Sequence, residues 1–125
     1  MGDLNDGPAD KSLVEVLETR LTLDNIQTQT LYNISCNLSD NNNFGTYKYK
    51  GFWNIFDQII VSDGLLRKNS TLQTGLNDFH IYVSDFILEE DKNYFGKKPF
   101  RTYNGFRYNN GYSDHLPVYC DFWIK

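Results

Sequence analysis

Asp57 and His115 are two residues of this sequence whose types together allow proton transfer, although they lie far apart along the chain. Asp57 falls within residues 53–62, where an extended strand places it on one face among large aliphatic side chains. A buried carboxylate without a partner costs several kcal/mol, so we expect Asp57 to have a dedicated one. His115, in the loop of residues 111–117, is the candidate. An aspartate that accepts the Nδ1 proton of a histidine fixes the tautomer and leaves Nε2 for an oxyanion or a nucleophile. A purely structural pair is an equal alternative on these residues alone.

A second polar cluster occupies residues 2–7, with glycine at both ends. Asp3 and Asn5 stand two positions apart, so a tight turn would point the carboxylate and the amide in the same direction. Taken by itself, such a cluster is more often turn chemistry or a helix cap than a functional site.

A basic segment follows in residues 92–112, which contain no Asp or Glu. Its cations alternate with aromatic residues, a composition that can bind nucleic acid through phosphate contacts and stacking. A solvated loop is the favoured alternative, because most charge runs are no more than that. The five cations are Lys92, Lys97, Lys98, Arg101 and Arg107.

Length and composition limit the class of protein. The 125 residues suit a single domain, and 40% hydrophobic with 16% aromatic residues is too much core-forming material for a disordered chain. The net charge of -4 gives no overall attraction to nucleic acid or to an anionic membrane. Any phosphate binding must therefore be local.

Targeting signals and cysteine chemistry are sparse. No stretch approaches the roughly 18 apolar residues of a membrane-spanning helix, and the first residues lack the basic and apolar regions of a signal peptide. The sequence does not identify a compartment. Cys36 and Cys120 are predicted to be separate buried thiols, with a disulfide as the less favoured alternative.

Patterning predicts two helices followed by strands. Apolar spacing favours a helix through residues 13–21 and a short second helix over residues 28–38. Strands are expected at residues 46–49, 53–62, 79–86 and 116–124, the last with Val118 and Cys120 on one face together with Phe122 and Ile124. Residues 92–112 read as a loop or an irregular hairpin.

Four stretches in order resemble one family. Gly2-Asp3-Leu4-Asn5 is similar to the Gly-Asp-x-Asn motif of the endonuclease/exonuclease/phosphatase superfamily, a group of metal-dependent phosphodiesterases. Residues 45–62 resemble the family's strand with an internal aspartate, and residues 111–118 resemble its terminal Ser-Asp-His signature. Residues 98–103 are similar to a subgroup common among bacterial members. The ordered set spans essentially the whole chain and is more specific than any one motif.

The resemblance implies catalytic roles. Asp3 would orient or deprotonate the attacking water, and Asn5 would donate to a non-bridging phosphate oxygen. His115, oriented by Asp57, would stabilise the charge that develops on the phosphoryl group.

Metal and substrate contacts are implied in the same way. Asp114 would sit near the metal, as a direct ligand or through water. Mg²⁺, or Mn²⁺ in its place, suits a site of oxygen ligands with several waters, and this chain alone would hold it weakly. Arg101 and Tyr47 are the expected substrate contacts. The substrate would be a phosphoester from nucleic acid, a phospholipid headgroup or a sugar phosphate.

The resemblance also implies an α/β (α+β) fold. Residues 1–125 would form the C-terminal half of the domain, half of a four-layer α/β sandwich, with one mixed, mainly antiparallel sheet and two helices on one side. The N-terminal half would be absent and would be a partner, and the open sheet face could also mediate homo-oligomers. The chain alone would then be nearly inactive. The alternative is a non-catalytic remnant or a module that binds anionic ligands such as nucleic acid.

Overall fold

The structure is a computed structural model that describes residues 1–37 and 44–125. It consists mostly of short strands joined by single helical turns. The helical turns are η1 (Ser12–Val16), η2 (Ile34–Asn37), η3 (Asp63–Leu65), η4 (Leu76–Asp78) and η5 (Asp85–Ile87). The strands are β1 (Gly2–Asp3), β2 (Leu31–Asn33), β3 (Tyr47–Tyr49), β4 (Phe52–Asn54), β5 (Asp57–Gln58), β6 (Ile60–Ser62), β7 (Leu72–Gln73), β8 (Phe79–Ile81), β9 (Leu88–Glu90), β10 (Lys97–Pro99), β11 (Tyr103–Asn104), β12 (Arg107–Tyr108), β13 (Val118–Cys120) and β14 (Trp123–Ile124).

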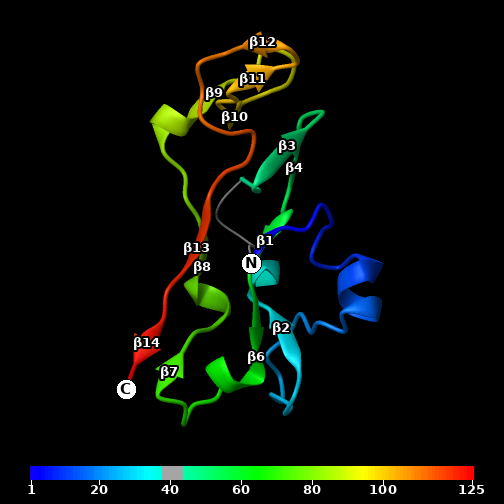
Figure 1. The fold of residues 1–125 in the computed structure, drawn as a ribbon, viewed down its shortest axis with the longest axis vertical. Coiled ribbons are helices and arrows are strands. Elements are labelled where there is room, and N and C mark those ends of the chain that lie inside the picture. Colours follow the sequence, from blue (N-terminus) through cyan, green and yellow to red (C-terminus); the bar gives the residue numbers. More distant parts are fainter. Residues whose placement is uncertain (38–43) are drawn as a thin grey trace.

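The strands pair as antiparallel two-stranded ladders. These are β1–β5, β2–β6, β3–β4, β7–β14, β8–β13, β9–β10 and β11–β12. Figure 1 shows an elongated molecule in which β8–β13 and β7–β14 follow one side and β2–β6 the other, with β3–β4 and the two hairpins above them. This arrangement agrees with the expected α/β class in its antiparallel strands and few helices. The two helices on one side of a single sheet are not seen.

One apolar core lies between the two sides of the molecule. It contains buried side chains from β2, β6 and β8, with Leu116 almost fully enclosed just before β13. Removing this apolar surface from water stabilises the packing of the ladders by roughly 25 cal/mol per Å². The buried members are Tyr32, Ile34, Ile59, Val61, Phe79, Ile81, Ile87 and Leu116.

Both helix predictions need correction. Residues 31–33 form strand β2, with Leu31 opposite Ser62 and Tyr32 opposite Val61, and only η2 after them is helical. Leu38 lies outside the described residues. Pairing with β6 buries Tyr32 and Asn33, a gain that outweighs the weak local helical preference. The first helix is a single π-type turn, η1, that ends near Leu17 because the next residue takes a positive φ of 56°.

The strand predictions hold in place but not in length. Strand β3 matches residues 46–49, whereas residues 53–62 divide into β4, β5 and β6. Residues 79–86 give β8 and then η5, and the C-terminal strand breaks after Cys120. Its predicted alternation holds at Val118 and Cys120 but fails at Ile124, which is 81% exposed.

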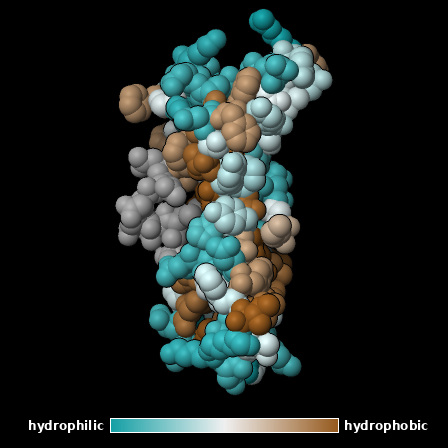
Figure 2. Space-filling view, turned by 90° about the vertical axis from the view of Figure 1, so that its left-hand side faces the viewer, coloured by the Kyte–Doolittle hydropathy of each residue, from teal (hydrophilic) through white to brown (hydrophobic). Residues whose placement is uncertain are grey.

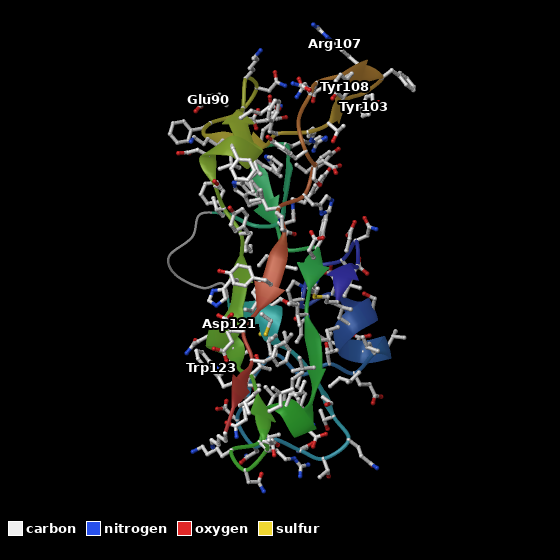
Figure 3. All side chains as sticks on the ribbon, turned by 60° about the vertical axis from the view of Figure 1, so that its left-hand side comes forward. Glu90, Tyr103, Arg107, Tyr108, Asp121 and Trp123 are labelled. Atoms are coloured by element: carbon white, nitrogen blue, oxygen red, sulfur yellow. The ribbon has the colours of Figure 1, made fainter. Side chains whose placement is uncertain are left out.

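The basic segment is an irregular hairpin pair, as predicted. The turn between β11 and β12 contains Gly105 at a φ of 60°, and the neighbouring Phe106 is fully exposed. Figure 3 shows Tyr103 and Tyr108 together on this hairpin, with Arg107 pointing outward from it. Two of the cations are engaged, because Lys97 lies 2.6 Å from Asp85 and Lys98 lies 3.7 Å from Glu89.

The two cysteines are free thiols, which confirms that they are separate, but both are only partly buried. Burial raises the pKa of the Cys36 thiol, and burial also raises that of Cys120. Thiols held in the neutral form are poor nucleophiles. Among the described residues no helix has the length and apolar character needed to cross a membrane.

A buried ion pair fastens the β9–β10 turn to β3. Lys48 Nζ lies 3.2 Å from Asp91 Oδ2, and the two side chains are only 3% and 6% exposed. The ammonium also donates to the carbonyl oxygens of Phe95 at 2.8 Å and Lys97 at 3.1 Å, so its three hydrogens are used. Burial acts to raise the pKa of Asp91, but backbone N–H groups and the Lys48 ammonium together hold it below its ordinary value.

We expect Asp91→Asn to destabilise the fold by at least about 2 kcal/mol at pH 7, because it leaves the Lys48 ammonium without its anion. A carboxylate with a lowered pKa stabilises the fold above its unfolded-state pKa, and this contribution is lost as the pH falls through the folded-state value. The difference between wild type and Asp91→Asn should therefore shrink below a pH of about 4. Urea unfolding at pH 7 and pH 3 measures it. Asp85→Asn, which removes an exposed partner of Lys97, is the control, and an equal loss in both variants contradicts the prediction.

Candidate functional site

Asp3, Asp57 and His115 meet where β1 pairs with β5. The register of this ladder sets Asp3 opposite Asp57. His115 Nδ1 lies 2.6 Å from Asp57 Oδ2, and His115 Nε2 lies 3.8 Å from Asp3 Oδ2. The first distance is a charge-assisted hydrogen bond, whereas the second is too long for a hydrogen bond. The imidazole is thus held at one nitrogen, with the other close to a carboxylate and open to a further partner.

Thr46 holds the two segments that carry Asp57 and His115. Its fully buried hydroxyl accepts the N–H groups of Phe56 at 3.0 Å and Asp57 at 3.1 Å. Its carbonyl oxygen accepts the N–H of Leu116 at 2.7 Å. One residue therefore fixes the backbone on both sides of the Asp57–His115 pair. Sequence reasoning did not single out Thr46, because a threonine that begins a strand carries no signal for such contacts.

Gly45 allows this close approach. A Cβ atom at position 45 would come within 2.3 Å of the carbonyl oxygen of Asn54, so any side chain would displace the backbone. Thr46 also donates its N–H to that same carbonyl at 2.8 Å. The Gly-Thr pair therefore brings β3 close against the end of β4.

Tyr47 and Arg101 extend the site as a stack of flat groups. The Tyr47 ring lies 4.7 Å from the His115 ring and 5.6 Å from the Phe56 ring, measured between centroids. The Arg101 guanidinium lies over the Tyr47 ring, 5.4 Å from its centroid. Such a cation–π contact adds roughly 0.5–2 kcal/mol and orients the guanidinium plane. The two expected substrate contacts are therefore adjacent to the imidazole.

Asn5 lies beside Asp3 in a strained turn. Its φ is 54°, and its backbone N–H donates to Asp3 Oδ1 at 2.9 Å. Asparagine tolerates this left-handed conformation better than most residues. The carbonyl of Asp6 in the same loop accepts the amide of Gln58 at 2.5 Å, which ties the loop to β5. Turn chemistry thus positions the Asp3 carboxylate.

Asp114 precedes His115 in the same loop and borders an open pocket of about 270 Å³ that Arg101, Tyr103 and Tyr112 also line. Its neighbour Ser113 accepts the N–H of His115 at 3.1 Å, so the loop is fixed next to the imidazole. Neither Asp3 nor Asp57 lines this pocket.

The carboxylates of Asp3, Asp57 and Asp114 are of the ligand type that a divalent metal binds, but they supply only part of a coordination shell. Among residues 1–37 and 44–125 no three His, Cys, Asp or Glu side chains are grouped to hold an ion. Carboxylate oxygens are nonetheless the ligands that Mg²⁺ prefers, and it often binds through one or two of them with water completing the shell.

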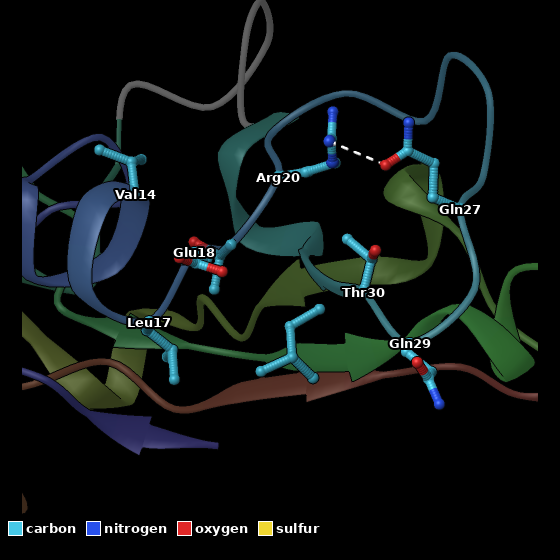
Figure 4. Close-up of a pocket in the computed structure, with 9 residues that line it drawn as sticks. Val14, Leu17, Glu18, Arg20, Gln27, Gln29 and Thr30 are labelled. Atoms are coloured by element: carbon cyan, nitrogen blue, oxygen red, sulfur yellow. Dashed lines mark hydrogen bonds between the residues drawn. The ribbon is translucent and has the colours of Figure 1, made fainter.

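A larger pocket of about 550 Å³ lies elsewhere, between η1 and β2. Figure 4 shows its walls, where Arg20 donates to Gln27 at 2.9 Å and Glu18 faces the opening. The pocket contains no histidine and none of the residues predicted for chemistry. Its size alone does not make it a reaction site, and the Asp3–His115–Asp57 group remains the candidate.

We expect Thr46→Val to lower stability by about 2 kcal/mol, because it leaves two buried N–H groups without an acceptor. It should also change the ¹⁵N shifts of the His115 ring as the Nδ1–H tautomer becomes less populated. Thr46→Ser, which keeps the hydroxyl, should restore both values. Thr74→Val is the matched control, since Thr74 bonds Asp121 away from the site. Unchanged ring shifts in a destabilised Thr46→Val would contradict a positioning role.

The comparisons with known proteins give one result. A sequence profile described as the Endonuclease/Exonuclease/phosphatase family matches residues 1–123. Searches of curated proteins and of solved structures found no match. Members of the family are in general hydrolases of phosphoesters, including nucleic acids, and typically use a divalent metal. The match covers nearly all of the 125 residues, and the chain therefore belongs to the endonuclease/exonuclease/phosphatase family.

Proposed function

We propose that this chain carries the phosphate-reacting residues of a Mg²⁺-dependent phosphoesterase. The observation that carries the proposal is the contact of His115 with Asp57 at one nitrogen and its approach to Asp3 at the other. A structural Asp–His pair needs only the first contact. The second carboxylate, 3.8 Å from Nε2, places a base and an imidazole nitrogen side by side, where both can face the same phosphate group.

The chemistry divides between the two carboxylates. Asp57 accepts a hydrogen bond from Nδ1–H and so orients the imidazole ring. In the imidazolium form, Nε2–H donates to a phosphoryl oxygen. Asp3 orients the attacking water and accepts its proton while the new P–O bond forms and the ester P–O bond breaks. Asn5 donates to a non-bridging oxygen, so developing negative charge meets fixed donors.

Asp114 is the metal ligand in this proposal, directly or through water. A bound Mg²⁺ or Mn²⁺ would supply positive charge that stabilises the phosphoryl oxygens in the transition state. Because the described residues supply only part of a coordination shell, we expect the chain alone to bind the metal weakly.

A second segment completes the domain in our proposal. The resemblance implies a four-layer α/β sandwich of which this chain, residues 1–125, is the C-terminal half. Large apolar side chains are exposed along β8–β13 and β7–β14. Figure 2 shows this side of the molecule, on which brown apolar side chains lie among paler and teal ones. The exposed side chains include Tyr82, Tyr119, Phe122, Trp123 and Ile124. Such a surface favours association, with the N-terminal half or with a second copy.

The alternative function is a non-catalytic module that binds anionic ligands through the basic hairpins. Arg107 and the exposed aromatic residues of β11–β12 favour it. The ion pairs of Lys97 and Lys98 reduce the free positive charge and count against it. Salt-dependent polynucleotide binding without turnover in the completed domain would support the module.

We expect His115→Ala to lower the phosphodiesterase rate of the completed domain at least about 100-fold, because it removes a preorganised donor from the transition state. The assay combines the chain with the family's N-terminal half and measures hydrolysis of a generic phosphodiester with and without Mg²⁺. The chain alone should show little turnover.

His80→Ala is the matched control. His80 pairs with Asp121 at 3.2 Å and stacks on Tyr119 at 4.9 Å, on the exposed side that we assign to association. The rates are therefore compared with the N-terminal half at saturating concentration, where loss of the His80 side chain should leave the rate nearly unchanged. Equal rates for His115→Ala and wild type, or no metal-dependent turnover in the completed domain, would overturn the proposal.

A further inference from the structure

A third pocket shares Arg101 with the pocket that Asp114 lines. It has a volume of about 230 Å³ and opens between β3 and the β9–β10 turn. Its lining is rich in cations, and Arg101 forms the wall that it shares with the pocket beside Asp114. The charged residues of its lining are Lys48, Lys50, Asp91, Lys98 and Arg101, and the amides are Asn93 and Asn104.

The cations of this pocket are not all neutralised. Asp91 neutralises Lys48 in the buried pair, and Glu89 lies 3.7 Å from Lys98. Within residues 1–37 and 44–125, by contrast, neither Lys50 nor Arg101 forms an ion pair with a carboxylate. Lys50 makes only a cation–π contact, at 5.3 Å from the Tyr49 ring. The pocket therefore presents an excess of positive charge, although the whole chain has a net charge of -4.

Arg101 has unused hydrogen-bond donors. Its Nε is buried without a partner, and its Nη2 makes a long contact of 3.5 Å with the carbonyl oxygen of Lys48. An acceptor that reached this guanidinium would satisfy donors that the protein leaves unpaired. A guanidinium has five donors in a fixed fork that matches the geometry of a phosphate.

We infer that this pocket is a subsite for a second phosphate group of the substrate, bound by Arg101 and Lys50 with Lys98. The inference rests on the proposed function, because the substrate is the phosphoester of that proposal. Binding of the anion itself does not depend on catalysis. Arg101 and His115 both lie against the ring of Tyr47, which connects this subsite with the candidate site.

The subsite bears on substrate class. A substrate with two phosphates near one another can occupy both positions, whereas a lipid headgroup with a single phosphodiester cannot. The two phosphates can come from a nucleic acid strand or from a phosphorylated polyol. Both sources present the same chemistry to Arg101, and the experiment separates them.

The first experiment titrates inorganic phosphate into the metal-free 125-residue chain and follows backbone and Arg101 Nε–H shifts by NMR. We expect saturable binding with a dissociation constant of roughly 1–10 mM, typical of a small isolated anion. Lys50→Gln and Arg101→Gln should each weaken it at least fivefold. Arg107→Gln is the matched control, because Arg107 points outward from the hairpin, and it should bind as wild type.

The second experiment compares ligands that differ only in a second phosphate. We expect 5′-phosphorylated dithymidylate to bind at least fivefold more tightly than dithymidylate, or inositol 1,4-bisphosphate more tightly than inositol 1-phosphate. Whichever pair shows the gain identifies the source, and Arg101→Gln should abolish the gain.

Two results would overturn the inference: phosphate binding that Lys50→Gln and Arg101→Gln leave unchanged, or no gain from a second phosphate in either pair. Failure of the proposed function is distinguishable from these. The Arg101 Nε–H shifts report the subsite itself, so an inactive completed domain in which phosphate still shifts them refutes the catalysis alone.

Discussion

The candidate site depends on the hydrogen bonds of Thr46. This residue is fully buried, and its hydroxyl and carbonyl oxygens receive N–H groups from the Asp57 segment and from the residue after His115. A buried threonine can satisfy these donors only if both segments approach it closely, which Gly45 permits. The 2.6 Å contact between Asp57 and His115 then follows from backbone geometry fixed by one residue. These hydrogen bonds fix the backbone of the Asp57 segment and of the His115 loop, although both have little regular structure.

Two cations in the upper half of the molecule, Lys48 and Arg101, differ in whether the protein neutralises them. Lys48 is fully used by Asp91 and two carbonyl oxygens, so it fastens a turn and offers nothing to a ligand. Arg101 lines the same pocket, and within residues 1–37 and 44–125 it has no carboxylate partner and a buried Nε without an acceptor. The two cations therefore differ in function because of their neighbours, although both belong to the same basic region. The stack from Arg101 through Tyr47 to His115 connects the unpaired cation with the candidate site.

Local pattern predicted some elements well and others poorly. Residues 46–49 and the 92–112 hairpins were predicted correctly, because aromatic runs and Gly-Asn turns carry short-range signals. Residues 28–38 were predicted as a helix but contain β2, since pairing with β6 buries Tyr32 and Asn33, and no local pattern contains that partner. The expected single sheet is a series of two-stranded ladders, because turns and positive-φ residues such as Lys50 interrupt the strands.

The sequence by itself determined the family and the chemical types of the site. The order of the motifs along the chain indicates the family. The aspartate in an apolar strand and the histidine in a loop indicate the residue types of the site, because both inferences depend only on residue identity and order. The tertiary structure alone decided which groups meet. It brought Asp3, Asp57 and His115 together, left Asp114 in a separate pocket, and made Thr46 the anchor and Arg101 the uncompensated cation. These are results of packing between residues distant in sequence, where burial and hydrogen-bond satisfaction depend on the whole chain.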